Sequence, residues 1–64
     1  MDFITAKERE VLDLVAQGLS TKQIAEQLSI SFHTVESHRK SLRSKFAVKN
    51  SVQLITKAFG NGQI

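Results

Sequence analysis

The chain has 64 residues, of which nine are lysine or arginine and six are aspartate or glutamate. A chain of this length forms at most one small domain, which buries roughly 60% of its unfolded surface. It has no cysteine, which excludes disulfides and cysteine-ligated metals, and its 41% hydrophobic content is typical of a globular domain. No apolar stretch reaches the ~18 residues that a membrane span needs, and no signal-peptide pattern opens the chain. We therefore expect a cytoplasmic domain with no membrane partner.

The charges are distributed unevenly along the chain. Residues 1–30 carry three basic and five acidic side chains, whereas residues 31–64 carry six basic side chains and one acidic side chain, Glu36. Lysine and arginine near phosphates release condensed counterions, which favours binding to an acidic polymer. The C-terminal half is therefore the candidate nucleic-acid surface.

A capping box opens the first predicted helix. Thr5 and Glu8 have the spacing at which each side chain bonds the other residue's backbone N–H, and a helix over 6–17 should follow. Gly18 lies where a left-handed C-terminal cap is expected, and Leu19 can pack back on the helix end. The apolar residues of this helix spread beyond one narrow face, which predicts packing on two sides: Val11, Leu12, Leu14 and Val15.

A second capping box, from Ser20 to Gln23, predicts a short helix over 21–28. Its apolar residues share one face: Ile24, Ala25 and Leu28. A three-residue turn over 29–31 follows, and Ser31 can cap the next helix.

The third predicted helix covers 32–46. Its apolar side holds Val35, Leu42 and Phe46, and its opposite side presents short polar and basic residues: Glu36, Ser37, Lys40, Ser41 and Ser44. Two helices joined by a tight turn, the second with one apolar and one polar face, suit docking in a DNA major groove.

The last predicted helix covers 51–59 and is capped by Asn50, with Gly60 to Gly62 ending it and the final residues frayed. Leu54 and Ala58 share one face, while Val52, Ile55 and Phe59 lie on an adjoining face. Either both faces belong to the core or the second is a self-association surface. No strand is predicted, so the expected fold is all-α with four helices.

Several motifs resemble the LuxR-type (NarL/FixJ-like) helix-turn-helix domain of bacterial response regulators and quorum-sensing activators. The match runs from about Ile4 to Ala58 and is carried by EREVL, GLSTKQIAEQL, TVESH and KF-x-V-x-N. The resemblance implies that residues 1–64 are one DNA-binding domain. We expect it to be the C-terminal output domain of a larger two-domain regulator, and the alternative is a stand-alone regulator of this size, which also exists in the family. It also implies double-stranded DNA as the partner, a homodimer through the fourth helix, and RNA polymerase as a further partner.

Carried over by position, the resemblance assigns two groups of residues. Base-facing positions fall on Glu36, Ser37 and Lys40. Backbone-facing positions fall on Thr21, Lys22, Ser31, Thr34, His38, Ser41 and Lys45. For a dimer through the fourth helix, the candidate contacts are the residues of its second apolar face: Val52, Ile55 and Phe59.

This chain departs from the family pattern at four positions, one of which is Lys7 in place of a common arginine near the start. Glu36 stands where many members have lysine, and Ser41 where many have asparagine, which changes the bases that could be read. Ala47 replaces the usual glycine, so a left-handed cap there is either absent or strained by roughly 1 kcal/mol.

Several of these residues have two interpretations. Lys40 can donate to guanine or only pair with a phosphate, and Glu36 can accept from a cytosine amino group. We expect instead that Glu36 pairs with Lys40 in the free protein, because the i,i+4 spacing favours an ion pair. Thr34 either strengthens the helix N-terminus or contacts phosphate. The stem of Arg39 is expected to cover apolar surface while its head reaches solvent or phosphate.

Other functions are weighed against DNA binding. His33 and His38 are five residues apart, which turns their imidazoles about 140° from each other on a helix, so we expect no metal site. No triad pattern is present, and the chain lacks room for a substrate pocket, so we expect neither an enzyme nor a cofactor. A sigma-factor promoter-reading region shares ER-x-VL and GLS-x-x-x-IA, but TVESH and KF-x-V-x-N favour the LuxR type. A helical protein-interaction adaptor that does not bind DNA is the alternative from another class, because Glu36 lies on the reading face.

Overall fold

The computed structural model describes residues 3–60, which form four helices and no strand. The helices are α1 (Ala6–Ala16), α2 (Thr21–Leu28), α3 (Phe32–Lys45) and α4 (Ser51–Ala58). The predicted all-α fold is confirmed, although three helices end one residue earlier than predicted because Gln17, Phe46 and Phe59 are C-caps. The predicted frayed ends at 61–64 lie outside the described residues.

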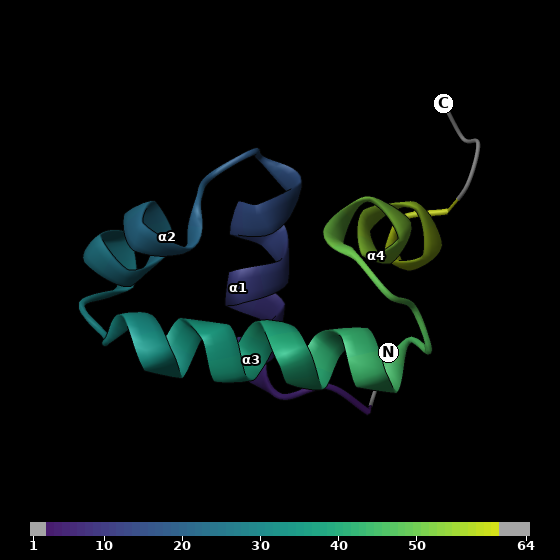
Figure 1. Cartoon of the computed structure of the whole chain (residues 1–64), viewed down its shortest axis with the longest axis horizontal. Coiled ribbons are helices and arrows are strands. Elements are labelled where there is room, and N and C mark those ends of the chain that lie inside the picture. The colour runs from purple at the N-terminus through teal and green to yellow at the C-terminus, as the bar shows by residue number, and fades with distance from the viewer. Residues whose placement is uncertain (1–2, 61–64) are drawn as a thin grey trace.

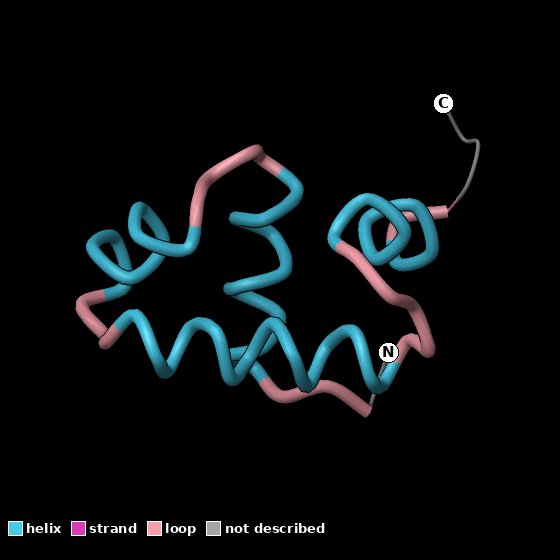
Figure 2. The backbone as a smooth tube through the Cα atoms, viewed as in Figure 1, coloured by secondary structure: helices cyan, strands magenta, loops and turns pink. Residues whose placement is uncertain are grey.

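The longest helix, α3, forms one side of the domain (Figure 1). In the view of Figure 2, α1 crosses α3 steeply near its middle, α2 lies over one end of α3, and α4 is seen end-on near the other end. α1 contacts each of the other three helices, as its broad apolar surface predicted. Within residues 3–60, no helix combines the length and apolar character that crossing a bilayer requires.

Side-chain caps begin all four helices at the predicted residues: Thr5, Ser20, Ser31 and Asn50. The capping box of α1 is complete, because Thr5 Oγ1 accepts from Glu8 N at 3.0 Å and Glu8 Oε1 accepts from Thr5 N at 2.9 Å. The box of α2 is also complete, with Gln23 in the place of the glutamate. These local hydrogen bonds satisfy the free N–H groups of the first turns and fix where each helix starts.

Left-handed residues end the first three helices. Gly18, Ser29 and Ala47 have φ values of 94°, 57° and 58°. Each is followed by a residue whose N–H bonds back across the helix end, as in Val48 N to Arg43 O at 2.9 Å. Ala47 therefore retains the left-handed cap where the family has glycine, at a strain of roughly 1 kcal/mol. Ser29 carries a similar strain that its sequence did not predict.

The core lies between α1, α2 and α3 and receives one residue of α4. Its buried apolar members are Val11, Leu12, Leu14, Val15, Ile24, Ala25, Val35, Leu42, Phe46 and Leu54. The predicted inward side of α3 is confirmed. The interpretation that both faces of the last helix are core is wrong for Val52 and Phe59, which are 75% and 44% exposed. Ile55 and Ala58 do pack against the core, because they lie nearer Leu54 on the helix surface.

Candidate nucleic-acid interface

The outward side of α3 is the candidate DNA-reading surface. Glu36, Ser37 and Lys40 are all exposed, whereas Val35 and Leu42 on the opposite side are completely buried. In Figure 1, α1, α2 and α4 lie above or behind α3, and only the segment that precedes α1 passes along part of its lower edge. The three residues predicted to face bases therefore share one accessible surface.

Glu36 has a partner on α2. Thr21 Oγ1 donates to Glu36 Oε2 at 2.6 Å, and no ion pair joins Glu36 to Lys40. The expected Glu36–Lys40 pair is therefore wrong for this structure. The physical reason is tertiary, because the N-terminus of α2 brings a hydroxyl and the positive end of a helix dipole to the carboxylate. The spacing of residues along α3 cannot predict Thr21 as the partner of Glu36, because Thr21 lies on α2.

Three basic side chains lie on the same two helices. Lys22, Lys40 and Arg43 form no ion pair with a carboxylate from residues 3–60. Their charges therefore remain available to phosphates. Arg43 was not among the predicted interface residues, and it lies three residues after Lys40 on a neighbouring part of the α3 surface.

A buried carboxylate connects α3 to α1. Glu8 is 5% exposed, and it accepts from Lys45 Nζ at 2.8 Å, from Ser41 Oγ at 2.7 Å and from Thr5 N at 2.9 Å. The hydrogen bond from Lys45, with help from Thr5 and Ser41, lowers the pKa of Glu8 to about 2, although burial acts in the opposite direction. The ion pair between the buried Glu8 carboxylate and the partly exposed Lys45 thus links α1 to α3.

The sequence indicated Glu8 only as a capping residue. The signal for burial was present, because Glu8 lies three and four residues before Val11 and Leu12, on the face that enters the core. Ser41 and Lys45, assigned to the DNA backbone by resemblance, both bond Glu8 in the structure. The Lys45 side chain is still 32% exposed, and its ammonium has three donors, so it retains donors for a phosphate.

Other residues predicted near the DNA backbone form hydrogen bonds within the domain. The Thr34 hydroxyl lies 2.8 Å from Ser31 Oγ, which also accepts from Thr34 N, so Thr34 supports the N-terminus of α3. Arg39 Nη2 donates to Ser51 Oγ at 2.6 Å. Its head therefore contacts the first turn of α4 through one of its five donors, and the side chain remains partly exposed. His38 is half-buried beside this surface.

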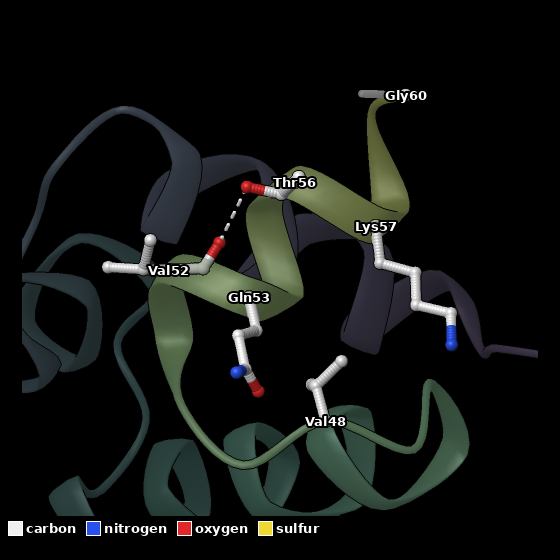
Figure 3. A pocket seen from close by; sticks show the side chains of 6 residues that line it. All are labelled: Val48, Val52, Gln53, Thr56, Lys57 and Gly60. Carbon is white, nitrogen blue, oxygen red and sulfur yellow. Dashed lines mark hydrogen bonds between the residues drawn. The ribbon is translucent and has the colours of Figure 1, made fainter. Parts of the chain in front are cut away.

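The exposed side of α4 contains a groove of about 510 Å³ (Figure 3). Its lining residues come from α4 and its flanking loops: Val48, Val52, Gln53, Thr56, Lys57 and Gly60. Thr56 Oγ1 donates to Val52 O at 3.0 Å, so the Thr56 hydroxyl is occupied by its own helix.

No group of three histidine, aspartate or glutamate side chains within residues 3–60 could hold a metal ion.

The arrangement of α2, a tight turn and an outward-facing α3 on a four-helix core defines a LuxR-type helix-turn-helix domain, a class of DNA-binding domain in transcription regulation. The family model for bacterial regulatory proteins of the luxR family matches residues 2–58, and the chain belongs to this family.

Several regulators and one solved structure are similar to the chain. The transcriptional regulatory protein MctR of Rhizobium johnstonii is 41% identical over 61 residues, covering 95% of this chain and 28% of MctR. DesR of Bacillus subtilis is 42% identical over 59 residues, covering 92% of this chain and 30% of DesR. The crystal structure of the response regulator ChrA, from a heme-sensing two-component system, superposes with a TM-score of 0.87 and 39% identity over 92% of this chain and 29% of the ChrA chain. The chain thus spans less than a third of the length of these relatives.

Proposed function

We propose that this domain binds double-stranded DNA sequence-specifically in transcription regulation, with α3 in the major groove and the N-terminus of α2 against the sugar-phosphate backbone. The observation that carries the proposal is the outward side of α3. It is polar and basic, and no other described helix covers it. An α-helix with such a face fits the width of the major groove.

Within this proposal, phosphates supply most of the affinity and a few side chains supply the specificity. Lys40 donates to guanine O6 and N7, Glu36 accepts from a base amino group, and Ser37 lets the helix lie deep in the groove. The proposed backbone contacts are Thr21, Lys22, Ser31, Thr34, His38, Ser41 and Lys45. Arg43 joins them because its charge is not paired with a carboxylate of the described chain.

We propose further that the domain forms a homodimer through α4. Val52 and Phe59 support this, because they are apolar and exposed on a helix that lies apart from the reading face. Ile55 packs against the core and contributes less to such a contact than its position in the sequence suggested. A two-fold dimer would place two copies of α3 on two DNA half-sites.

We also propose that residues 1–64 form the C-terminal output domain of a larger cytoplasmic regulator that acts on RNA polymerase. The relatives named above are more than three times as long as the matched region. MctR and DesR are transcriptional regulatory proteins by name, which supports a regulatory region outside the matched segment.

A salt titration tests the proposed function. Binding of the chain to a fluorescently labelled duplex is measured by anisotropy at several salt concentrations. The logarithm of the association constant should fall linearly with the logarithm of the salt concentration. Lys22→Ala should reduce the slope by about one unit, whereas Lys57→Ala on α4 is the matched control and should leave it unchanged. An affinity that does not depend on salt, or no affinity for any duplex, would favour the protein-interaction adaptor instead.

A further inference from the structure

A hydrogen bond joins the two helices of the helix-turn-helix on the side that faces DNA. Thr21 is the first residue of α2, and its hydroxyl donates to the Glu36 carboxylate of α3 at 2.6 Å. This length lies in the range of charge-assisted O–H to carboxylate hydrogen bonds. The Thr21 backbone is held by the complete capping box between Ser20 and Gln23, so its hydroxyl occupies a defined place.

The bond separates two opposite charges that would otherwise meet. Glu36 and Lys40 are four residues apart in one helix, with the acidic residue first, which is the favoured order for an ion pair. No such pair is present in the structure. Lys40 therefore keeps all its donors, and Glu36 keeps its charge and most of its acceptor positions, because a carboxylate has about four and Thr21 uses one.

A carboxylate held in this way discriminates between bases. It has no donor, it repels phosphates, and it gains a partner in the major groove only where a base presents an amino group. Glutamate accepts from the N4 amino group of cytosine, so a cytosine opposite Glu36 is favoured over a base that presents only acceptors.

From these contacts we infer that Thr21 is a positioning residue for base recognition: it holds the Glu36 carboxylate away from Lys40, so that Glu36 selects a cytosine at one position of the half-site. The inference rests on the proposed DNA-binding function. It assigns Thr21 a role in specificity, beyond the backbone contact that its position in the family implies.

The test starts from sequences that the chain selects from a pool of random duplexes. Four duplexes that differ only at the selected cytosine are then compared with the wild-type chain, Thr21→Val, Thr21→Ser and Glu36→Gln. The wild type should prefer cytosine by about fivefold or more, since a well-placed base contact discriminates by about that factor at least. Thr21→Val and Glu36→Gln should both lose most of this preference, Thr21→Ser should keep it, and the double variant Thr21→Val with Glu36→Gln should lose no more than either single variant.

Two results would overturn the inference while leaving the proposed function intact. One is a Thr21→Val chain that binds all four duplexes more weakly by the same factor, with the cytosine preference unchanged, which would make the hydroxyl a phosphate donor. The other is a wild type that binds DNA with a preference that Glu36→Gln does not alter. Absence of salt-dependent binding by the wild type would instead refute the proposed function itself. Thermal unfolding of each variant by circular dichroism is the folding control. If Thr21→Val destabilises the domain, Thr21→Ala, which also removes the hydroxyl, takes its place and should lose the cytosine preference in the same way.

Discussion

The buried Glu8 makes a specific prediction about acid stability. The carboxyl has a pKa of about 2 in the folded domain and 4.5 as its ordinary value, which we take for the unfolded chain. Because the folded pKa is the lower one, the ionised group stabilises the fold above pH ~4.5, and this contribution is lost as the pH falls toward 2. Glu8→Gln removes the charge while keeping the shape of the side chain.

The size of the effect follows from the shift in pKa. At ~1.4 kcal/mol per unit, the shift corresponds to about 3 kcal/mol, which we reduce to roughly 2–3 kcal/mol because Lys45 is partly exposed and water screens the pair. A domain of this size has a total unfolding free energy of roughly 3–10 kcal/mol, so the loss is a large share of it.

Urea unfolding followed by circular dichroism at several pH values measures this contribution. Between pH 6 and pH 2, the unfolding free energy of the wild type should fall by roughly 2–3 kcal/mol more than that of Glu8→Gln, because every other carboxylate is common to both chains. Glu10→Gln is the matched control on the same helix. Glu10 forms only an exposed pair with Lys7, 3.0 Å apart, so its removal should change stability by less than about 0.5 kcal/mol. Parallel pH profiles for the wild type and Glu8→Gln would refute the assignment of a stabilising buried ion pair.

Four further substitutions test other features of the domain. Ala47→Gly should raise the unfolding free energy by up to about 0.5 kcal/mol in urea titrations, because relief of the left-handed strain exceeds the added freedom of the unfolded chain; a loss of stability would argue against the left-handed cap. Lys40→Ala should cost about 1–3 kcal/mol in DNA affinity and relax preference at one base pair, whereas a uniform loss over all sequences would place Lys40 on a phosphate. Val52→Glu and Phe59→Glu should lower the average mass in sedimentation experiments from that of a dimer towards that of a monomer. Helicity should not be lost, since both side chains are exposed, and an unchanged mass would contradict dimerisation through α4.

Features set by neighbouring residues could be predicted from the sequence. The starts of all four helices follow from caps such as Thr5 and Asn50, whose partners lie three residues away. The inward side of α3 follows from the spacing of Val35 and Leu42, because a helix repeats every 3.6 residues. The left-handed Gly18 was also predicted, since glycine adopts positive φ without a steric penalty.

Features that depend on how helices meet could not be predicted. The bond from Thr21 to Glu36 joins residues 15 apart, and the bond from Lys45 to Glu8 joins residues 37 apart. Both depend on the crossing of helices, which no local pattern specifies. The same applies to Arg39, whose partner Ser51 lies on the next helix. The sequence therefore predicted which side of α3 faces outward, and the structure was needed to find which of its side chains are already occupied.

The proposed placement of α3 in the major groove can be tested by NMR on the 15N-labelled chain with a duplex that it selects. The amide signals that shift most on titration should belong to 36–45 of α3 and to the N-terminus of α2 around Thr21. Those of α4 around Thr56 should shift little as long as no dimer forms through α4. Shifts centred on α4, with α3 unchanged, would contradict the central claim that the outward side of α3 receives the DNA.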